Sequence, residues 1–133
     1  MSTIQTVYTA NAPVPAGHYS QAVIHNGLIY VSGQLPIDEK GTKMTDAPVA
    51  QQATQVLQNV AAILKAAGSD RNQVLQMTLY VADVEHWGEV NRVYAEFFGA
   101  HKPARAVVPV KELHYGLAIE VQVIAAVETA SSD

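Results

Sequence analysis

LAIEVQVIAAV, residues 117–127, decides the fold of this chain. Successive side chains of a β-strand point to opposite faces of its sheet, and here both faces are apolar. One face has Leu117, Ile119, Val121 and Val123, and the other has Ala118, Ile124 and Ala126. A strand that is apolar on both faces needs a cover on each side of its sheet. The fold therefore depends on how many helices the chain has to cover it.

A long amphipathic helix is predicted in the middle of the chain, from about Asp46 to Gly68. Thr45 or Asp46 can cap its N-terminus, Pro48 suits the first turn, and Gly68 stands where a C-terminal stop belongs. Apolar residues with helical spacing of three and four form its buried side. They are Val49, Ala53, Val56, Leu57, Val60, Ile63, Leu64 and Ala67.

A second, shorter helix is predicted to open at Asp83 and to end before Gly99. Its apolar side has the same helical spacing, so this helix also has one face to bury. That side consists of Trp87, Val90, Tyr94 and Phe97.

Period-two patterns predict five strands, and Asn26-Gly27 predicts a tight hairpin turn between the first two. The strands are expected at residues 20–25, 28–33, 72–83, 104–110 and 117–127, with a surface loop at 36–48. The order β-β-α-β-α-β-β is that of an α+β domain, a mixed sheet with two helices on one face. Because two helices cover only one face, we expect a neighbouring subunit to cover the other.

Composition limits the function classes. The 133 residues fit one domain, 1–133, and without cysteine there is no disulfide and no thiolate chemistry. No histidine pair has zinc-ligand spacing, so we expect no metal. The formal charge of −4 and the scattered basic residues give no stripe for phosphates, so no nucleic-acid partner is expected. No apolar run reaches the ~18 residues of a membrane span and no secretory signal is visible, which favours the cytoplasm.

HKPARAVVPV, residues 101–110, sets one arginine in an apolar run that is typical of a buried strand. A guanidinium keeps its charge, so burying Arg105 demands an anion. If the two strands are neighbours, Glu120 of the last strand can pair with it as a semi-buried salt bridge. Alternatively, Arg105 waits for the carboxylate of a small acid, and Glu120 handles a proton or a water. The residue types leave both interpretations open.

Three further places have polar groups that can line a site, each with an ordinary alternative. Tyr19 precedes a strand, where a tyrosine more often packs with its hydroxyl satisfied. Ser32-Gly33 marks a place where the backbone approaches a ligand or bends at a bulge. Asn91 lies in the second helix and faces either the site or solvent. Neither Ser20 nor Ser32 has the surroundings of a nucleophile.

Four separated motifs together resemble the reactive intermediate deaminase family (Rid/YjgF). They are PVPAGHYSQAV (13–23), YVSGQLPID (30–38), VNRVYAEFF (90–98) and KPARAVVPV with AIEVQVIA (102–125), within a match over residues 12–127. The resemblance implies a chorismate-mutase-like fold assembled as a homotrimer, with sites in clefts between subunits. It also implies cofactor-free hydrolysis of small 2-imino acids and enamines to 2-keto acids and ammonia.

Roles for individual residues follow from the same resemblance. The arginine of PAR is Arg105, which in the family grips the substrate carboxylate, and the glutamate of AIEVQ is Glu120, associated with the attacking water. Val107 stands where relatives often have cysteine and where the backbone is thought to take part. The other pocket residues carried over by motif are Tyr19, Asn91, Ser32 and Gly33.

Two departures from the family pattern concern substrate preference. His18 stands in GHYSQ where proline is usual, and LHYG (113–116) replaces a polar turn containing proline. Two other functions stay open beside imine hydrolysis. Relatives have been described as RNA-cleaving or translation-inhibiting proteins, and the same carboxylate anchor would serve a non-catalytic regulatory protein.

Overall fold

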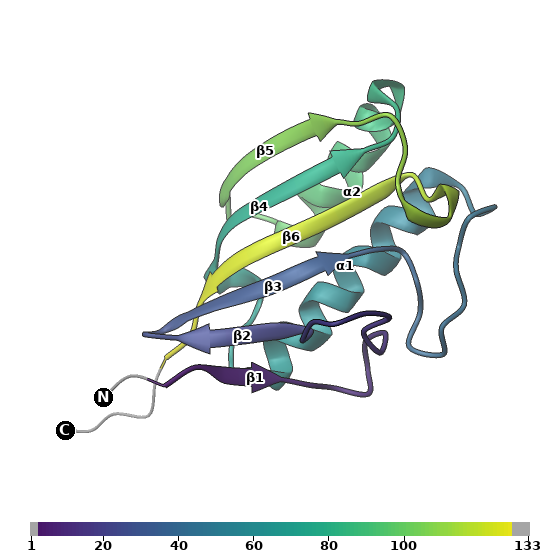
Figure 1. The fold of residues 1–133 in the computed structure, drawn as a ribbon. Coiled ribbons are helices and arrows are strands. Elements are labelled where there is room, and N and C mark those ends of the chain that lie inside the picture. The colour runs from purple at the N-terminus through teal and green to yellow at the C-terminus, as the bar shows by residue number, and fades with distance from the viewer. Residues whose placement is uncertain (1–2, 129–133) are drawn as a thin grey trace.

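A computed structural model describes residues 3–128, so the ends of the predicted domain, 1–2 and 129–133, lie outside the described residues. One six-stranded sheet has the order β1-β2-β3-β6-β4-β5, and both helices lie behind it in Figure 1. The strands are β1 (Gln5–Val7), β2 (Ala22–His25), β3 (Leu28–Gln34), β4 (Val74–Val81), β5 (Ala104–Pro109) and β6 (Ile119–Ala126). The helices are α1 (Val49–Ala66) and α2 (Trp87–Phe98), with short 3-10 turns η1 (Arg71–Gln73), η2 (Val84–His86) and η3 (His114–Gly116).

The sheet is mixed, as predicted: β4 and β5 are parallel and all other neighbours are antiparallel. The predicted hairpin is confirmed, because Asn26 and Gly27 both have positive φ, 51° and 79°, and join β2 to β3. The short edge strand β1, which pairs with β2, was not predicted. Its three residues are too few for an alternating pattern to stand out.

The core lies between the sheet and the helices, and α1 supplies the largest share of its helical side. The predicted apolar face of α1 is confirmed, with Ile63 and Leu64 fully buried. The predicted cap by Thr45 or Asp46 is wrong. The helix begins later, with Pro48 as N-cap and no side-chain cap bond. The hydroxyl of Thr45 instead donates to the carbonyl of Tyr115, at 3.0 Å.

The second helix differs in detail from its prediction. Asp83 caps the turn η2 and not α2, because its carboxylate accepts from the backbone N–H of Glu85 at 2.9 Å. Phe98, rather than Phe97, is the buried phenylalanine, and Gly99 ends the helix with a φ of 62°.

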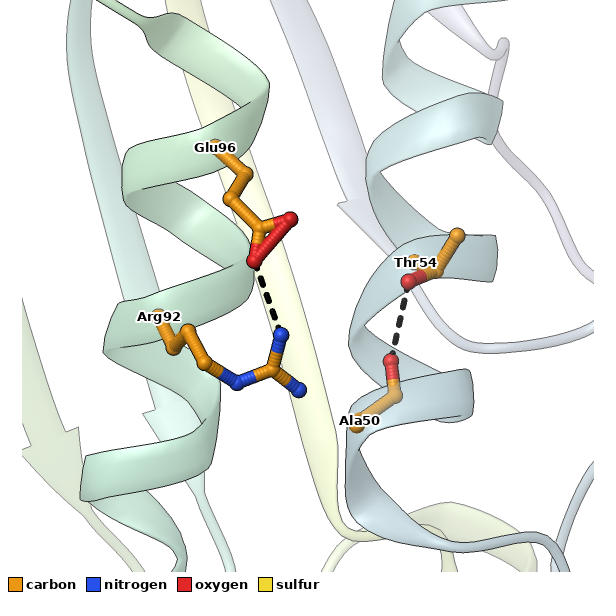
Figure 2. A network of polar contacts seen from close by, with 4 residues as sticks. All are labelled: Ala50, Thr54, Arg92 and Glu96. Atoms are coloured by element: carbon orange, nitrogen blue, oxygen red, sulfur yellow. Dashed lines mark hydrogen bonds and ion pairs between the residues drawn. The ribbon is translucent and has the colours of Figure 1, made fainter.

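The outer side of the helix layer is polar. Arg92 and Glu96 of α2 form an exposed ion pair at 2.8 Å, which is the only ion pair among residues 3–128 (Figure 2). Beside it, the Thr54 hydroxyl donates to the Ala50 carbonyl within α1, at 3.0 Å. An exposed pair of this kind stabilises the fold by about 0–1 kcal/mol, so this surface contributes little to stability.

The opposite face of the sheet has no cover within the described chain (Figure 1). On β6 the helix-facing residues Ile119, Val121 and Val123 are buried, whereas Ile124 on the other face is only half-buried. The open face is also less apolar than Ala118, Ile124 and Ala126 alone suggested, because Glu120 and Gln122 of β6 share that face with them. Its large apolar side chains include Tyr30 of β3 and Val108 of β5, which are 43% and 36% exposed.

Candidate functional site

The strand that contains Arg105 is an exposed edge strand, and its predicted burial is wrong for the single chain. β5 pairs only with β4, and all of its residues except Val107 are exposed. An edge strand has one sheet neighbour instead of two. An apolar sequence like that of a buried strand can therefore be exposed when it lies at an edge.

Arg105 lies on the helix-facing side of β5, where its register partner is the buried Met77 of β4. Its guanidinium carbon is 4.7 Å from the centre of the Trp87 ring and 4.9 Å from that of the Tyr94 ring. One Nη1–H donates to Oδ1 of Asn91 at 2.9 Å. Trp87, Asn91 and Tyr94 share one side of α2, because positions i, i+4 and i+7 line up on a helix. Asn91 therefore faces the arginine and is at the same time exposed to solvent.

Tyr94 forms the deep wall of this arrangement. Its hydroxyl is buried and has no hydrogen-bond partner in the part of the chain that the structure describes. Burial raises the pKa of Tyr94, and the nearby positive charge of Arg105 acts in the opposite direction. The residue thus faces Arg105 with an uncharged ring.

Glu120 lies on the other face of the sheet. It is paired across β6 and β4 with Tyr80, and its carboxyl group packs over the backbone of Gly33. A methyl group built on Gly33 would lie 3.2 Å from the carboxyl carbon of Glu120 and would overlap one of its oxygens. The predicted irregularity at Ser32-Gly33 is confirmed, since the β3–β6 register shifts between Val31 and Gln34. Glycine at this bulge makes room for the carboxylate.

Burial raises the pKa of Glu120, and the positive charge of His114 opposes that shift. The competition between burial and a nearby cation, which the sequence left undecided, is thus won by burial. The opposing cation is a histidine and not Arg105. A carboxyl group with a raised pKa is better suited to exchange protons near neutral pH.

A cavity of 810 Å³ opens at Glu120 and brings several predicted residues together. Tyr19 lines it with half of its surface exposed, and its hydroxyl also accepts from the backbone N–H of Ala16 at 3.4 Å, so the cavity position and a satisfied hydroxyl occur together. Ser32 lines it too, and its hydroxyl donates to the carbonyl of Ser20 at 2.6 Å. The predicted residues in this cavity are Tyr19, Ser32, Gly33 and Glu120.

The remaining predicted residues form a second group around Arg105. Asn91 contacts the guanidinium, and Val107, two positions along β5, is half-buried against the core. Strand β4 separates β5 from β6, so the condition under which Arg105 and Glu120 could pair across neighbouring strands is not met. Arg105 and Glu120 point to opposite faces of the sheet, and no Arg105–Glu120 salt bridge exists. One chain therefore holds two half-sites, one with the cation and one with the carboxylate.

Trp87 and Tyr94 do pack with the core as their helical spacing predicted, and sequence reasoning missed that both rings also lie against Arg105. The available signal was their spacing around Asn91. The departing segment 113–116 does lie at the rim of the Glu120 cavity, which it lines with Leu113, His114 and Tyr115, and sequence reasoning missed Lys43 beside it. There the Lys43 ammonium lies 4.6 Å from the centre of the Tyr115 ring, and Tyr115 has a φ of 61° without being glycine.

Residues 3–128 also bear on two other classes of feature, metal centres and membrane-spanning helices. No group of three or more metal-ligating histidines or carboxylates occurs there. None of the helices in that range combines the length and the apolar character that crossing a bilayer requires.

Comparison with known proteins supplies the family context. The family model described as "Endoribonuclease L-PSP" matches residues 9–127. A RutC family protein of Pyrococcus horikoshii is 41% identical over 91% of this chain and 96% of its own. A rat protein named 2-iminobutanoate/2-iminopropanoate deaminase is 41% identical over 94% of this chain and 93% of its own. The crystal structure of E. coli TdcF with bound serine superposes with a TM-score of 0.88 at 31% identity, covering 93% of this chain and 99% of that one.

Proposed function

The chain belongs to the Rid/YjgF family, and on that premise we propose that it hydrolyses small 2-imino acids and their enamine tautomers to 2-keto acids and ammonia. The observation that carries the proposal is the state of Arg105. Its guanidinium is held by α2 but has no carboxylate partner within the described chain. A fixed cation without an anion is suited to bind the carboxylate of a small acid.

The proposal includes a homotrimer whose sites lie between subunits. Two half-sites on opposite faces of one sheet cannot act on the same small molecule. A second copy laid on the open sheet face would set its Arg105 edge against the Glu120 cavity of the first and would bury Tyr30 and Val108. A closed ring of copies satisfies every subunit in the same way.

The chemistry requires only anchoring and proton transfer. Arg105 would hold the carboxylate by charge-assisted hydrogen bonds, each contributing about 1.5–3 kcal/mol. Water adds to the C=N carbon while Glu120 accepts its proton, giving a carbinolamine. Glu120 then returns the proton to nitrogen. As the C–N bond breaks, the carbinolamine hydroxyl gives its proton to Glu120, which passes it to the departing ammonia, so that the 2-keto acid and ammonium remain. No electrons are exchanged, so the proposed reaction needs no redox cofactor. We place the reaction in the cytoplasm.

A coupled assay tests this proposal. A pyridoxal-phosphate dehydratase releases 2-imino acid from threonine, and the appearance of 2-ketobutyrate is followed with and without this protein. Arg105→Ala should lower the added rate at least tenfold, which corresponds to ~1.4 kcal/mol of transition-state binding. Arg92→Ala is the matched control, because Arg92 pairs only with Glu96 on the outer helix surface. Equal rates for the two variants would exclude Arg105 as anchor.

RNA cleavage is the second candidate, favoured by the description of the matching family model. The formal charge of −4 counts against a phosphate-binding surface. Metal-free RNA cleavage by the wild type that Arg105→Ala leaves unchanged, without any effect on keto-acid release, would favour this candidate. Tight binding of 2-ketobutyrate without faster keto-acid release would instead indicate a non-catalytic regulatory protein.

A further inference from the structure

The guanidinium of Arg105 is held in an unusual way for an exposed arginine. Its partners are two aromatic rings and one neutral amide, none of which cancels its charge. A guanidinium has five N–H donors, and within residues 3–128 only the one bonded to Asn91 has an acceptor. Four donors thus stay available on a side chain whose position is already fixed.

We propose that Trp87 and Tyr94 are positioning residues that hold the Arg105 guanidinium in place for a ligand carboxylate, and that the fluorescence of Trp87 changes when the carboxylate binds. This inference rests on the proposed function, because it concerns the same anchor. The two rings explain how an arginine on an exposed edge strand can still serve as the carboxylate anchor.

The physical basis is the cost of ordering a long side chain. A free arginine loses much rotamer freedom when it binds a ligand, and this loss lowers affinity. Trp87 and Tyr94 attract the cation by the negative faces of their rings, which orders it before the ligand arrives. A carboxylate in their place would order it equally well but would occupy the donors and neutralise the charge.

The chain contains a second arginine on a ring of the same helix, and it serves as an internal comparison. Arg71 lies 4.7 Å from the centre of the Phe97 ring, as close as Arg105 lies to Trp87. However, its Nη1–H donates to the carbonyl of Phe97 at 2.9 Å, so this arginine ties down the end of α2. The Arg71–Phe97 pair lines neither half-site and has a structural role. Phe97→Leu is therefore a matched control for loss of a ring beneath an arginine.

The two rings beneath Arg105 differ in what they offer to an experiment. Tyr94 is 7% exposed and its hydroxyl has no partner among the described residues, so its contribution comes from the ring. Trp87 is half-buried and is the only tryptophan in the chain. A carboxylate bound to Arg105 changes the charge beside this indole, so its emission should change on binding.

The experiment is a titration of the whole protein with 2-ketobutyrate, followed by Trp87 emission in the wild type and by calorimetry in every variant. We expect Trp87→Leu and Tyr94→Leu to weaken binding about five- to thirtyfold, equivalent to ~1–2 kcal/mol. Trp87→Phe and Tyr94→Phe, which keep a ring, should weaken it less. Phe97→Leu should lower the melting temperature without changing binding. For the imine reaction, Trp87→Leu should raise KM more than it lowers kcat, because the anchor acts in both substrate and transition state.

The outcomes separate this inference from the function on which it rests. If the leucine variants bind as tightly as the phenylalanine variants, the positioning role is overturned. If Arg105 and both rings matter for binding but no imine is hydrolysed, the positioning role stands and the proposed reaction fails. A wild type that does not bind 2-ketobutyrate refutes both.

Discussion

The two half-sites of this chain are built by different means. The cationic half-site at Arg105 is assembled from one strand and three side chains of one helix, and nothing in it is strained. The carboxylate half-site at Glu120 depends on a bulge, a glycine and a half-buried acid with a raised pKa. The comparison teaches that a folded chain can prepare each group completely and still leave the two apart; assembly with another copy is then part of the chemistry that we propose.

The largest effect is expected when each half-site is removed in a different variant and the two variants are then assembled together. Arg105→Ala and Glu120→Ala should each lose at least tenfold in turnover of 2-imino acid, or ~1.4 kcal/mol. When the two variants are unfolded, mixed equally and refolded together, about a quarter of the shared sites should regain both residues. The measurement is keto-acid release by the mixture compared with each variant alone. A site within one chain gives no recovery, which would refute the shared-site proposal.

A smaller but still large effect is expected from Gly33→Ala. The added methyl group must displace the Glu120 carboxyl, so turnover should fall about tenfold, a loss of ~1.4 kcal/mol, while 2-ketobutyrate still binds through Arg105. Gly88→Ala is the matched control, because a side chain there meets no atom within 4 Å. In α2 this control should stabilise the fold by about 0.5–1 kcal/mol. Parallel loss of binding and turnover in Gly33→Ala would argue for general misfolding.

The smallest effect concerns stability and pH, and Glu120→Gln measures it. The folded chain raises the pKa of Glu120 above its ordinary value of 4.5, so the folded state holds this proton more tightly than the unfolded state. The resulting stabilisation is present below pH 4.5 and is lost as pH rises through the raised pKa. Glu120→Gln lacks this titration. The melting temperature of Glu120→Gln minus that of the wild type should therefore increase from pH 4 to pH 8. A difference that stays constant over this range would contradict a raised pKa.

Much of the fold was predictable from local patterns. The hairpin at Asn26-Gly27 and the apolar side of α1 depend on neighbouring residues, and both are confirmed. The cap at Thr45 failed for a non-local reason, since its hydroxyl bonds to Tyr115, 70 positions away. The burial assigned to the Arg105 strand failed because strand order, which places β5 at an edge, has no local signature.

The members of the candidate site could be proposed from motifs, but their arrangement could not. Motif resemblance named Arg105, Glu120 and their companions, whereas the separation by β4 became visible only in the sheet. Trp87 and Tyr94 were identified but assigned to the core, because an aromatic residue at helical spacing serves packing and cation binding equally well. Only the distance from ring to guanidinium distinguishes the two roles.

Both rims of the sheet discourage sideways growth. β1 at one rim has only three residues, and β5 at the other ends in Pro109 and directly follows Pro103, neither of which has an N–H to donate. Strand-by-strand addition, the route to amyloid-like filaments, is thus poorly supported at either rim. In the assembly that we propose, copies therefore meet through the open sheet face and not through their strand edges.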